Sequence, residues 1–142
     1  MGSSRLNLLL DTHIWLWSHS EPERLVKRVS AALTDEGNQL WLSPVSIWEF
    51  LLLAERGRVR VQKGSASEWA EAALSRAPMH DAPLSREVAL RSRSVRVDHE
   101  DPADRFLAAT AQVYELTLVT ADERLLRGKG FRTLANRPGS GL

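Results

Sequence analysis

The feature that most constrains the fold is an alternation of short apolar runs with segments that have helical spacing. The clearest runs cover residues 6–10, 40–42 and 117–120. Runs of this length are typical of strands that are buried on both faces, as in a parallel sheet. Strands separated by helices need right-handed crossovers, which place helices on both faces of the sheet. We therefore predict an α/β fold built on a short, mainly parallel sheet.

Capping signals predict where the main helices begin. Ser43-Pro44 is typical of an N-cap followed by the first helical position, and that helix is expected to end near Gly57. Residues 65–68 have the spacing of a capping box. Asp101 before Pro102 repeats the cap-and-proline signature and is predicted to be the N-cap of a helix through Val113. Weaker patterns predict helices over residues 23–33 and 85–95 and short strands within residues 78–84 and 131–134.

The length of 142 residues predicts one domain, which we assign to residues 5–136. Residues 1–4 are interpreted as a possible cloning remnant, and residues 137–142 as a flexible tail. The absence of cysteine excludes a disulfide framework, a thiolate zinc site and a cysteine nucleophile, and it favours a reducing cytoplasm. No apolar run approaches the roughly 20 residues of a membrane helix, so we expect a cytoplasmic protein without a membrane partner.

Two acids follow predicted strands. Asp11 comes directly after the first strand, and Asp122 comes two residues after the strand at 117–120. Ligands in open α/β sheets bind at the carboxyl ends of strands, so both positions favour a binding role. Each acid could equally cap a following helix, and the sequence leaves both interpretations open.

Two further acids lie where helical spacing predicts burial. Glu49 has Val45, Leu52 and Leu53 at positions i−4, i+3 and i+4, and Asp104 has apolar residues at i+3, i+4 and i+7. A buried carboxylate must be protonated, paired or bound to a cation, because burial of the bare charge is prohibitive. The alternatives are that Glu49 reaches solvent at the edge of its stripe, and that Asp104 interacts with the helix dipole.

If the four acids converge at the carboxyl edge of the sheet, their repulsion calls for a cation. Two carboxylates about 5 Å apart repel by roughly 3 kcal/mol at an effective dielectric constant near 20. Oxygen ligands without thiols favour Mg²⁺ or Mn²⁺, and magnesium held by a few carboxylates typically acts on phosphates. One or two such ions can generate the nucleophile and stabilise the leaving oxygen in phosphodiester hydrolysis.

The order and spacing of these motifs resemble PIN-domain ribonucleases, and especially the VapC-like toxins of bacterial type II toxin–antitoxin pairs. The resemblance spans about residues 6–134. It rests on Asp11-Thr12-His13, on residues 46–50 (SIWEF), on residues 101–111 (DPADRFLAATA) and on residues 118–122 (LVTAD). It implies a PIN-like three-layer fold and a Mg²⁺-dependent endoribonuclease, with Mn²⁺ as a substitute ion, that cleaves tRNA or rRNA and inhibits translation. The implied partners are RNA, a small cognate antitoxin and a second copy of the chain.

The resemblance also assigns roles to individual residues. It implies a catalytic and metal-binding set that comprises Asp11, Glu49, Asp104 and Asp122. Within that set, Asp11 and Asp104 would be the primary magnesium ligands. The hydroxyls expected to orient these acids or to contact substrate are those of Thr12, Ser46 and Thr120.

Other classes of protein explain the motifs less well. A non-catalytic PIN-like interaction module remains an alternative, in which the acids serve only as helix caps. Receiver domains need adjacent acids after the first strand, and haloacid-dehalogenase-type phosphatases need Asp-x-Asp-x-Thr. Neither pattern is present, because Asp11 is followed by Thr12-His13-Ile14.

Aromatic, basic and apolar residues near the acids suggest contact surfaces. Trp15 and Trp17 either line a base-stacking platform or interface groove, or pack in the core, and Trp48 is expected to face the core or a dimer seam. Sixteen of the 19 basic residues are arginines, which either bind phosphates or reflect codon bias. The basic stretches at 56–63 and 91–96 either contact RNA or form solvated faces, and the apolar segments at 14–16 and 50–52 are expected to receive the antitoxin.

Overall fold

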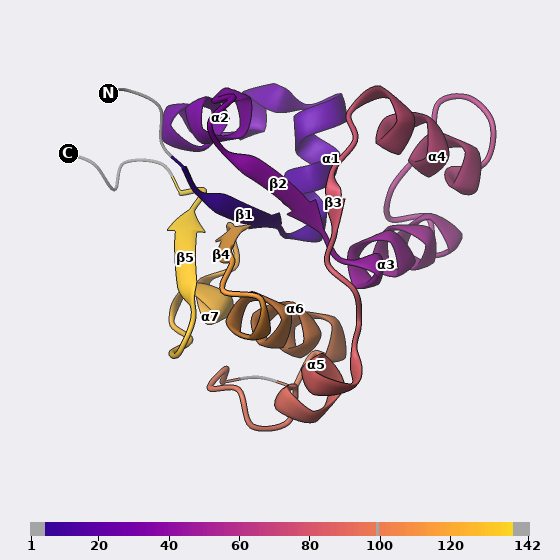
Figure 1. Cartoon of the computed structure of the whole chain (residues 1–142). Helices are drawn as coiled ribbons and strands as arrows, with labels where there is room; N and C mark the ends of the chain where they lie inside the picture. The colour runs from indigo at the N-terminus through magenta and orange to yellow at the C-terminus, as the bar shows by residue number, and fades with distance from the viewer. Residues whose placement is uncertain (1–4, 99, 138–142) are drawn as a thin grey trace.

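One parallel sheet forms the centre of the computed structural model, which describes residues 5–98 and 100–137 (Figure 1). Its strands are β1 (Asn7–Leu10), β2 (Gln39–Leu42), β3 (His80–Asp81), β4 (Thr117–Thr120) and β5 (Arg132–Ala135). They lie in the order β3-β2-β1-β4-β5, and every neighbouring pair is parallel. The predicted α/β class and parallel sheet are confirmed.

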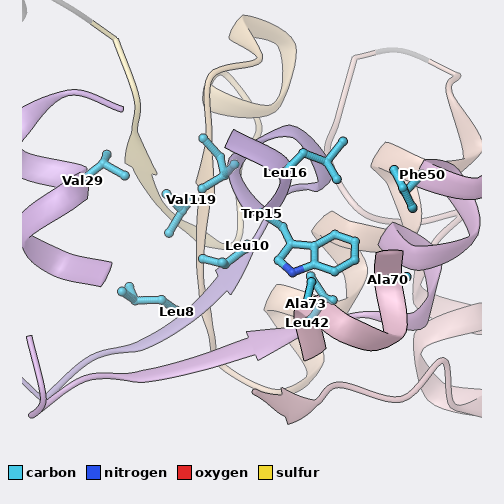
Figure 2. Packing of buried hydrophobic residues seen from close by; sticks show 11 residues of the cluster. Leu8, Leu10, Trp15, Leu16, Val29, Leu42, Phe50, Ala70, Ala73 and Val119 are labelled. Atoms are coloured by element: carbon cyan, nitrogen blue, oxygen red, sulfur yellow. The ribbon is translucent and has the colours of Figure 1, made fainter. Parts of the chain in front are cut away.

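Successive residues of β1 face opposite sides of the sheet, and this alternation divides the core into two clusters. Leu8 and Leu10 pack on one side, around Trp15 (Figure 2), whereas Leu9 packs on the other side with Leu107. The first side is covered by α1 (Thr12–Ser20), α2 (Lys27–Thr34), α3 (Pro44–Glu55) and α4 (Ala66–Arg76). The second side carries α6 (Pro102–Val113) and α7 (Glu123–Leu126), and α5 (Arg86–Arg91) packs against α6. The chain therefore has the predicted three layers. Among the helices that the structure describes, none is long and apolar enough to cross a membrane.

The predicted capping signals mark helix starts in the structure. Ser43 accepts a hydrogen bond from the Val45 N–H at 3.0 Å and begins α3, and the residues at 65–68 form a complete capping box before α4. Asp101 caps α6 by accepting from the backbone N–H groups of its first turn. Helix α3 ends before Gly57, whose φ of 71° lies in the left-handed region that favours glycine.

The helix predicted over residues 23–33 is interrupted, and a tertiary contact explains the break. A 3-10 turn (Pro22–Arg24) comes first, and α2 begins only at Lys27. Between them the Val26 N–H donates to the Asn136 side-chain oxygen at 2.7 Å, and the Asn136 amide donates to the Arg24 carbonyl at 3.1 Å. These bonds to a distant residue replace the local bonds that a continuous helix would make.

Helix α1 was predicted only as the alternative in which Asp11 caps a following helix, and its apolar side chains are deeper than expected. Trp15 has no exposed surface and contacts Phe50 and Trp69 edge-on, with ring centroids 6.0 and 5.5 Å away. It therefore belongs to the core and cannot form a stacking platform. Trp17, two residues later, is only half-buried.

A buried arginine shortens the next predicted helix. The pattern at 85–95 forms helix only over α5, because the carbonyls that follow are bound by Arg105 of α6. The Arg105 side chain is 7% exposed and donates to the carbonyls of Ser92, Val95 and Val97 at 2.8 to 3.0 Å, and to that of Arg93 at 3.3 Å. This guanidinium therefore fastens the segment before α6 to the helix itself.

Replacement of Arg105 by Met should destabilise the protein by about 3 kcal/mol or more, because several buried carbonyls lose their donors. Urea unfolding measures the change. Arg93→Met is the matched control, since the Arg93 side chain is exposed and pairs with Glu100, which is also exposed. Equal stability of the two variants would show that Arg105 is not a structural clamp.

Candidate active site

The direction in which the chain adds strands to the sheet reverses at β1, between β2 on one side and β4 on the other. From β1 the chain moves outward to β2 and β3, and it then returns to the other side of β1 with β4. Crevices that bind ligands form at such switch points, outside the carboxyl ends of the strands. Asp11 follows β1 directly and Asp122 follows β4 after one residue, and the Asp11 N–H donates to the Val119 carbonyl at 3.0 Å. The topology therefore sets these two acids at one edge.

Two helices bring the other expected acids to the same edge. Glu49 comes from α3, which packs against both α1 and α6, and Asp104 comes from the first turn of α6. Asp104 is only 8% exposed and Glu49 is half-buried, as their apolar stripes predict. A pocket of about 360 Å³ is lined by all four acids, Asp11, Glu49, Asp104 and Asp122, together with Asp101, His13, Ile14, Trp17 and Ala121.

Buried hydroxyl groups hold two of these carboxylates. Thr120 has no exposed surface, and its hydroxyl donates to Asp11 Oδ2 at 2.6 Å while accepting from the Asp122 N–H at 3.0 Å. The other oxygen of Asp11 accepts from the Thr12 N–H at 2.8 Å. Thr120 therefore links the acid after β1 to the turn after β4.

Two further hydroxyls, of Thr12 and Ser46, hold Glu49. The Thr12 hydroxyl donates to Glu49 Oε1 at 2.5 Å, and the hydroxyls of Thr12 and Ser46 are hydrogen-bonded at 3.1 Å. Thr12 and Ser46 have no exposed surface. Ser46 thus acts on Glu49 through Thr12 rather than directly.

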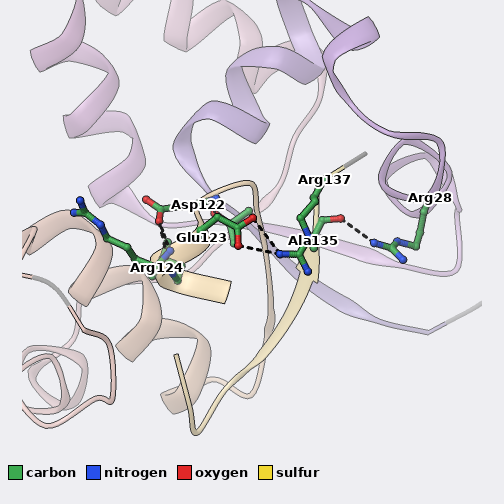
Figure 3. A network of polar contacts seen from close by, with 8 residues as sticks. Arg28, Asp122, Glu123, Arg124, Ala135 and Arg137 are labelled. Carbon is green, nitrogen blue, oxygen red and sulfur yellow. Dashed lines mark hydrogen bonds and ion pairs between the residues drawn. The ribbon is translucent and has the colours of Figure 1, made fainter. Parts of the chain in front are cut away.

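Three acids both cap a helix and line the pocket. Asp11, Asp101 and Asp122 are the N-caps of α1, α6 and α7, and all three also line the pocket. Figure 3 shows the case of Asp122, whose Oδ1 accepts from the Arg124 N–H at 2.8 Å. The two interpretations that the sequence left open for Asp11 and Asp122 are therefore compatible.

The end of β5 is tied down next to this cap. Arg137 pairs with Glu123 at 2.9 Å, and Arg28 donates to the Ala135 carbonyl at 3.1 Å (Figure 3). Arg137, the first residue of the tail expected at 137–142, thus has a defined contact. The remainder of that tail and residues 1–4 lie outside the described residues.

Burial and mutual repulsion raise the pKa of two acids. Burial, and then the nearby carboxylates of Asp11, Asp101, Asp122 and Glu49, raise the pKa of Asp104 to about 8. Burial also raises the pKa of Asp11 to about 6, although the hydrogen bonds from Thr120 and Thr12 act in the opposite direction. A strongly shifted acid within a cluster of like charges is typical of a site that binds a cation or moves a proton.

The donor set suits a hard divalent cation. Its oxygens come from carboxylates, and one or two carboxylates with several waters are enough to bind Mg²⁺. Within residues 5–98 and 100–137, no three acidic or histidine side chains are already close enough to ligate one ion together. The chemistry therefore fits an ion that retains much of its water rather than a closed protein cage.

The apolar surface expected for an antitoxin is not available where it was predicted. Ile14, Trp15, Leu16 and Phe50 are each at most 5% exposed, because they form the core beneath α1 and α3. Leu51 is only partly buried and lines a hollow between α3, the loop that follows it and the start of α4. The sequence could not separate these positions, since the helix is apolar around most of its circumference.

Comparisons with known proteins agree with this geometry. The PIN domain family matches residues 8–130. Ribonuclease VapC22 of Mycobacterium tuberculosis is 31% identical over 121 residues, which are 83% of this chain and 88% of that protein.

Solved structures show the same fold at lower identity. VapBC2 from Rickettsia felis, bound to a DNA fragment from its promoter, matches with a TM-score of 0.68 and 15% identity, over 92% of this chain and 98% of that chain. FitAcB from Neisseria gonorrhoeae matches with a TM-score of 0.61 and 20% identity, over 91% and 97% of the two chains.

The raised pKa of Asp104 predicts that the metal-free protein loses stability as the pH rises from about 4 to about 8. Over this range folded Asp104 keeps a proton that the unfolded chain releases near 3.8, so the free energy of unfolding falls as the pH rises. Asp104→Asn should remove most of this dependence and should exceed the wild type in stability at pH 8. Urea unfolding in EDTA at pH 5 and pH 8 measures both effects.

The exposed Asp81 provides a matched control, since Asp81→Asn removes a carboxylate outside the pocket. It should retain the pH dependence of the wild type. An Asp104→Asn protein with that same dependence would contradict the assignment of the shift to Asp104.

Proposed function

This chain belongs to the PIN-domain family, and on that premise we propose that it is a divalent-metal-dependent endoribonuclease that uses Mg²⁺. The observation that carries the proposal is the pocket shared by Asp11, Glu49, Asp104 and Asp122, which come from four different elements. The other carboxylates of the pocket help to raise the pKa of Asp104, and a bound cation would oppose that rise. The name ribonuclease, borne by the relative from M. tuberculosis, supports RNA as the substrate.

Different residues of the chain would have different roles in such a site. Asp11 and Asp104 would hold the ion, with Glu49 and Asp122 beside them. Mg²⁺, when bound, would lower the pKa of a coordinated water and supply positive charge for the phosphate oxygens. The hydroxyl of Thr120 fixes the direction of the Asp11 carboxylate, and Thr12 does the same for Glu49. These side chains therefore hold the charges in place before substrate arrives.

The alternative of a non-catalytic module, in which the acids only cap helices, does not explain Glu49. Glu49 lies within α3, whose N-cap is Ser43. Capping therefore gives no reason for a half-buried carboxylate at this position, whereas binding of a cation does.

We also propose that the enzyme is a toxin that inhibits translation by cleaving tRNA or rRNA and is silenced by a small antitoxin. Solved VapBC and toxin–antitoxin complexes share the fold of this chain and support this assignment. A basic side chain of the antitoxin would occupy the acidic pocket in place of the ion.

If the acids bind one ion, Mn²⁺ or Mg²⁺ should raise the Tm of the wild type with increasing concentration, because the ion binds only the folded state. Asp104→Asn should respond weakly. Thermal melts from zero to 10 mM metal, about the range for weakly held Mg²⁺, measure this. A non-catalytic module would melt alike with and without Mn²⁺.

Hydrolysis by water predicts RNA products with 5′-phosphate and 3′-hydroxyl ends, which end-group analysis of labelled fragments detects. Asp11→Asn, Glu49→Gln and Asp104→Asn should each slow cleavage by about 100-fold or more, and Asp122→Asn should slow it less. Thr120→Val should slow it by about 10- to 100-fold, because Asp11 and the turn at Asp122 lose the hydroxyl that orients them while both carboxylates remain.

The exposed Asp81→Asn serves again as control and should cleave like the wild type. Cyclic phosphate ends that form in EDTA would exclude the metal-dependent mechanism, because they would indicate attack by the ribose 2′-hydroxyl.

A homodimer is also proposed, through an apolar pocket beside the active site. Trp48 is 54% exposed and Leu84 is 45% exposed, so Trp48 does not face the core. They line a hollow of about 350 Å³ together with Pro44, Val45, Pro102 and Phe106. A second copy would cover the same patch through a two-fold axis, as is common in homodimers.

Trp48→Glu should shift the protein from dimer to monomer in light scattering after gel filtration, because it buries a charge in the interface. The monomer should remain folded, because Trp48 is 54% exposed in a single protomer, but its Tm should lie below that of the dimer. Leu6→Glu is the control, because Leu6 is 42% exposed and precedes β1 at the amino ends of the strands, outside the apolar hollow. A monomeric wild type would contradict the proposed dimer.

A further inference from the structure

A second groove, larger than the acidic pocket, opens beside it. Its volume is about 950 Å³, at the upper end of the roughly 300–1,000 Å³ of sites that hold a small molecule. His13 and Trp17 of α1 line both the groove and the acidic pocket, so the two hollows adjoin at these side chains. The other walls are the 3-10 turn before α2, the loop at 58–63 and Trp69 of α4.

The groove has the opposite charge to the pocket. Its basic side chains are those of Arg24, Arg58, Arg60 and Lys63, and Glu21 is its acidic one. Glu21 is already paired with Arg24 at 3.5 Å. In the part of the chain that the structure describes, no carboxylate pairs with the cations of the 58–63 loop. Those three charges are therefore available to an anionic ligand.

An aromatic face lies where the two hollows meet. Trp17 is half-buried, with the Arg24 guanidinium 4.7 Å from its ring centroid and the His13 ring 5.7 Å away. Trp69 is supported from behind by Phe50, with ring centroids 4.9 Å apart. Rings of this kind bind nucleobases by stacking, and neighbouring cations bind the phosphates of the same strand.

We propose that this groove binds the single-stranded stretch of RNA next to the scissile phosphate. The cations of the loop at 58–63 bind its backbone, and Trp17 stacks on the base closest to the acidic pocket. This assignment rests on the proposed nuclease function, and it explains how a polyanion approaches a pocket that repels it. A duplex keeps its bases stacked inside, so it presents none to Trp17. An acidic protein segment would match the charges but would make no use of the half-buried Trp17 ring.

The test is binding without chemistry. A fluorescein-labelled 12-nucleotide single strand of mixed RNA sequence is titrated in EDTA, with fluorescence anisotropy as the readout. In the combined variant Arg58→Ala, Arg60→Ala, Lys63→Ala, the slope of log Kd against log salt should fall by about 2. Each phosphate contact to a single strand contributes about 0.7 to that slope, and three contacts are removed.

The second basic stretch supplies a matched control. Arg91, Arg93 and Arg96 line neither hollow, and their combined replacement by Ala removes the same charge. That protein should keep the affinity and the slope of the wild type. Trp17→Ala should weaken binding by roughly 5- to 150-fold without changing the slope, and Trp17→Phe, which keeps a ring, should restore most of it. Circular dichroism melts identify any variant that fails to fold. The three loop substitutions should not impair folding, because Arg58, Arg60 and Lys63 are exposed.

Three outcomes would overturn the proposal. The first is a triple loop variant with the affinity and slope of the wild type. The second is equal affinity of the wild type for the single strand and for its duplex. The third is displacement of the RNA by a poly-glutamate peptide as readily as by unlabelled RNA at equal charge, which would assign the groove to an acidic protein segment.

The proposed function can fail separately. If the wild type binds RNA through the groove but does not cleave it with Mg²⁺ or Mn²⁺, the groove is supported and the nuclease assignment is wrong. If the wild type cleaves RNA and the triple loop variant binds and cleaves equally well, the nuclease assignment holds and the groove is wrong.

Discussion

Like charges held away from water are the constraint on which the rest of this structure depends. Asp104 is 8% exposed and lies among other carboxylates that raise its pKa to about 8, so the metal-free fold must oppose their repulsion. The opposition comes from deeply buried parts of the chain. Leu8, Leu9 and Leu10 of β1 are at most 1% exposed, and the acid that follows them is bound by Thr120 and Thr12. The acids thus lie on elements with little freedom to separate.

The parts of the fold that local chemistry decides could be predicted from the sequence. The apolar runs gave the strands, and capping residues such as Ser43 and Asp101 gave the helix starts. Glu49 and Asp104 were recognisable because each interrupts an apolar stripe. What local patterns could not predict depends on distant partners: Asn136 interrupts the expected helix at Val26, and burial separates Trp15 from Trp17.

Charge patterns in the sequence were ambiguous in the same way. The two basic stretches looked alike, but Arg91 and Arg93 pair with nearby glutamates, whereas the loop at 58–63 lines the groove beside the acids. Only the packing of α3 and α4 brings that loop next to α1. Three acids of the pocket, Asp11, Asp101 and Asp122, also cap helices. The hydrogen bond that begins each of these helices fixes the direction of the carboxylate, so the same contacts stabilise the fold and arrange the site. Substitution by Asn keeps such a cap and removes only the charge.

The clamp formed by Arg105 also determines the rotation of α6 about its own axis. Neighbouring residues of an α-helix project about 100° apart, so a fixed direction for Arg105 fixes the direction of Asp104. A turn of the helix by about 25° would move a Cα atom by about 1 Å, given a backbone radius of about 2.3 Å. Misplacement by that distance is enough to slow an enzyme by about 100-fold. The four carbonyls that bind Arg105 therefore fix the direction in which Asp104 points, although they do not belong to the pocket.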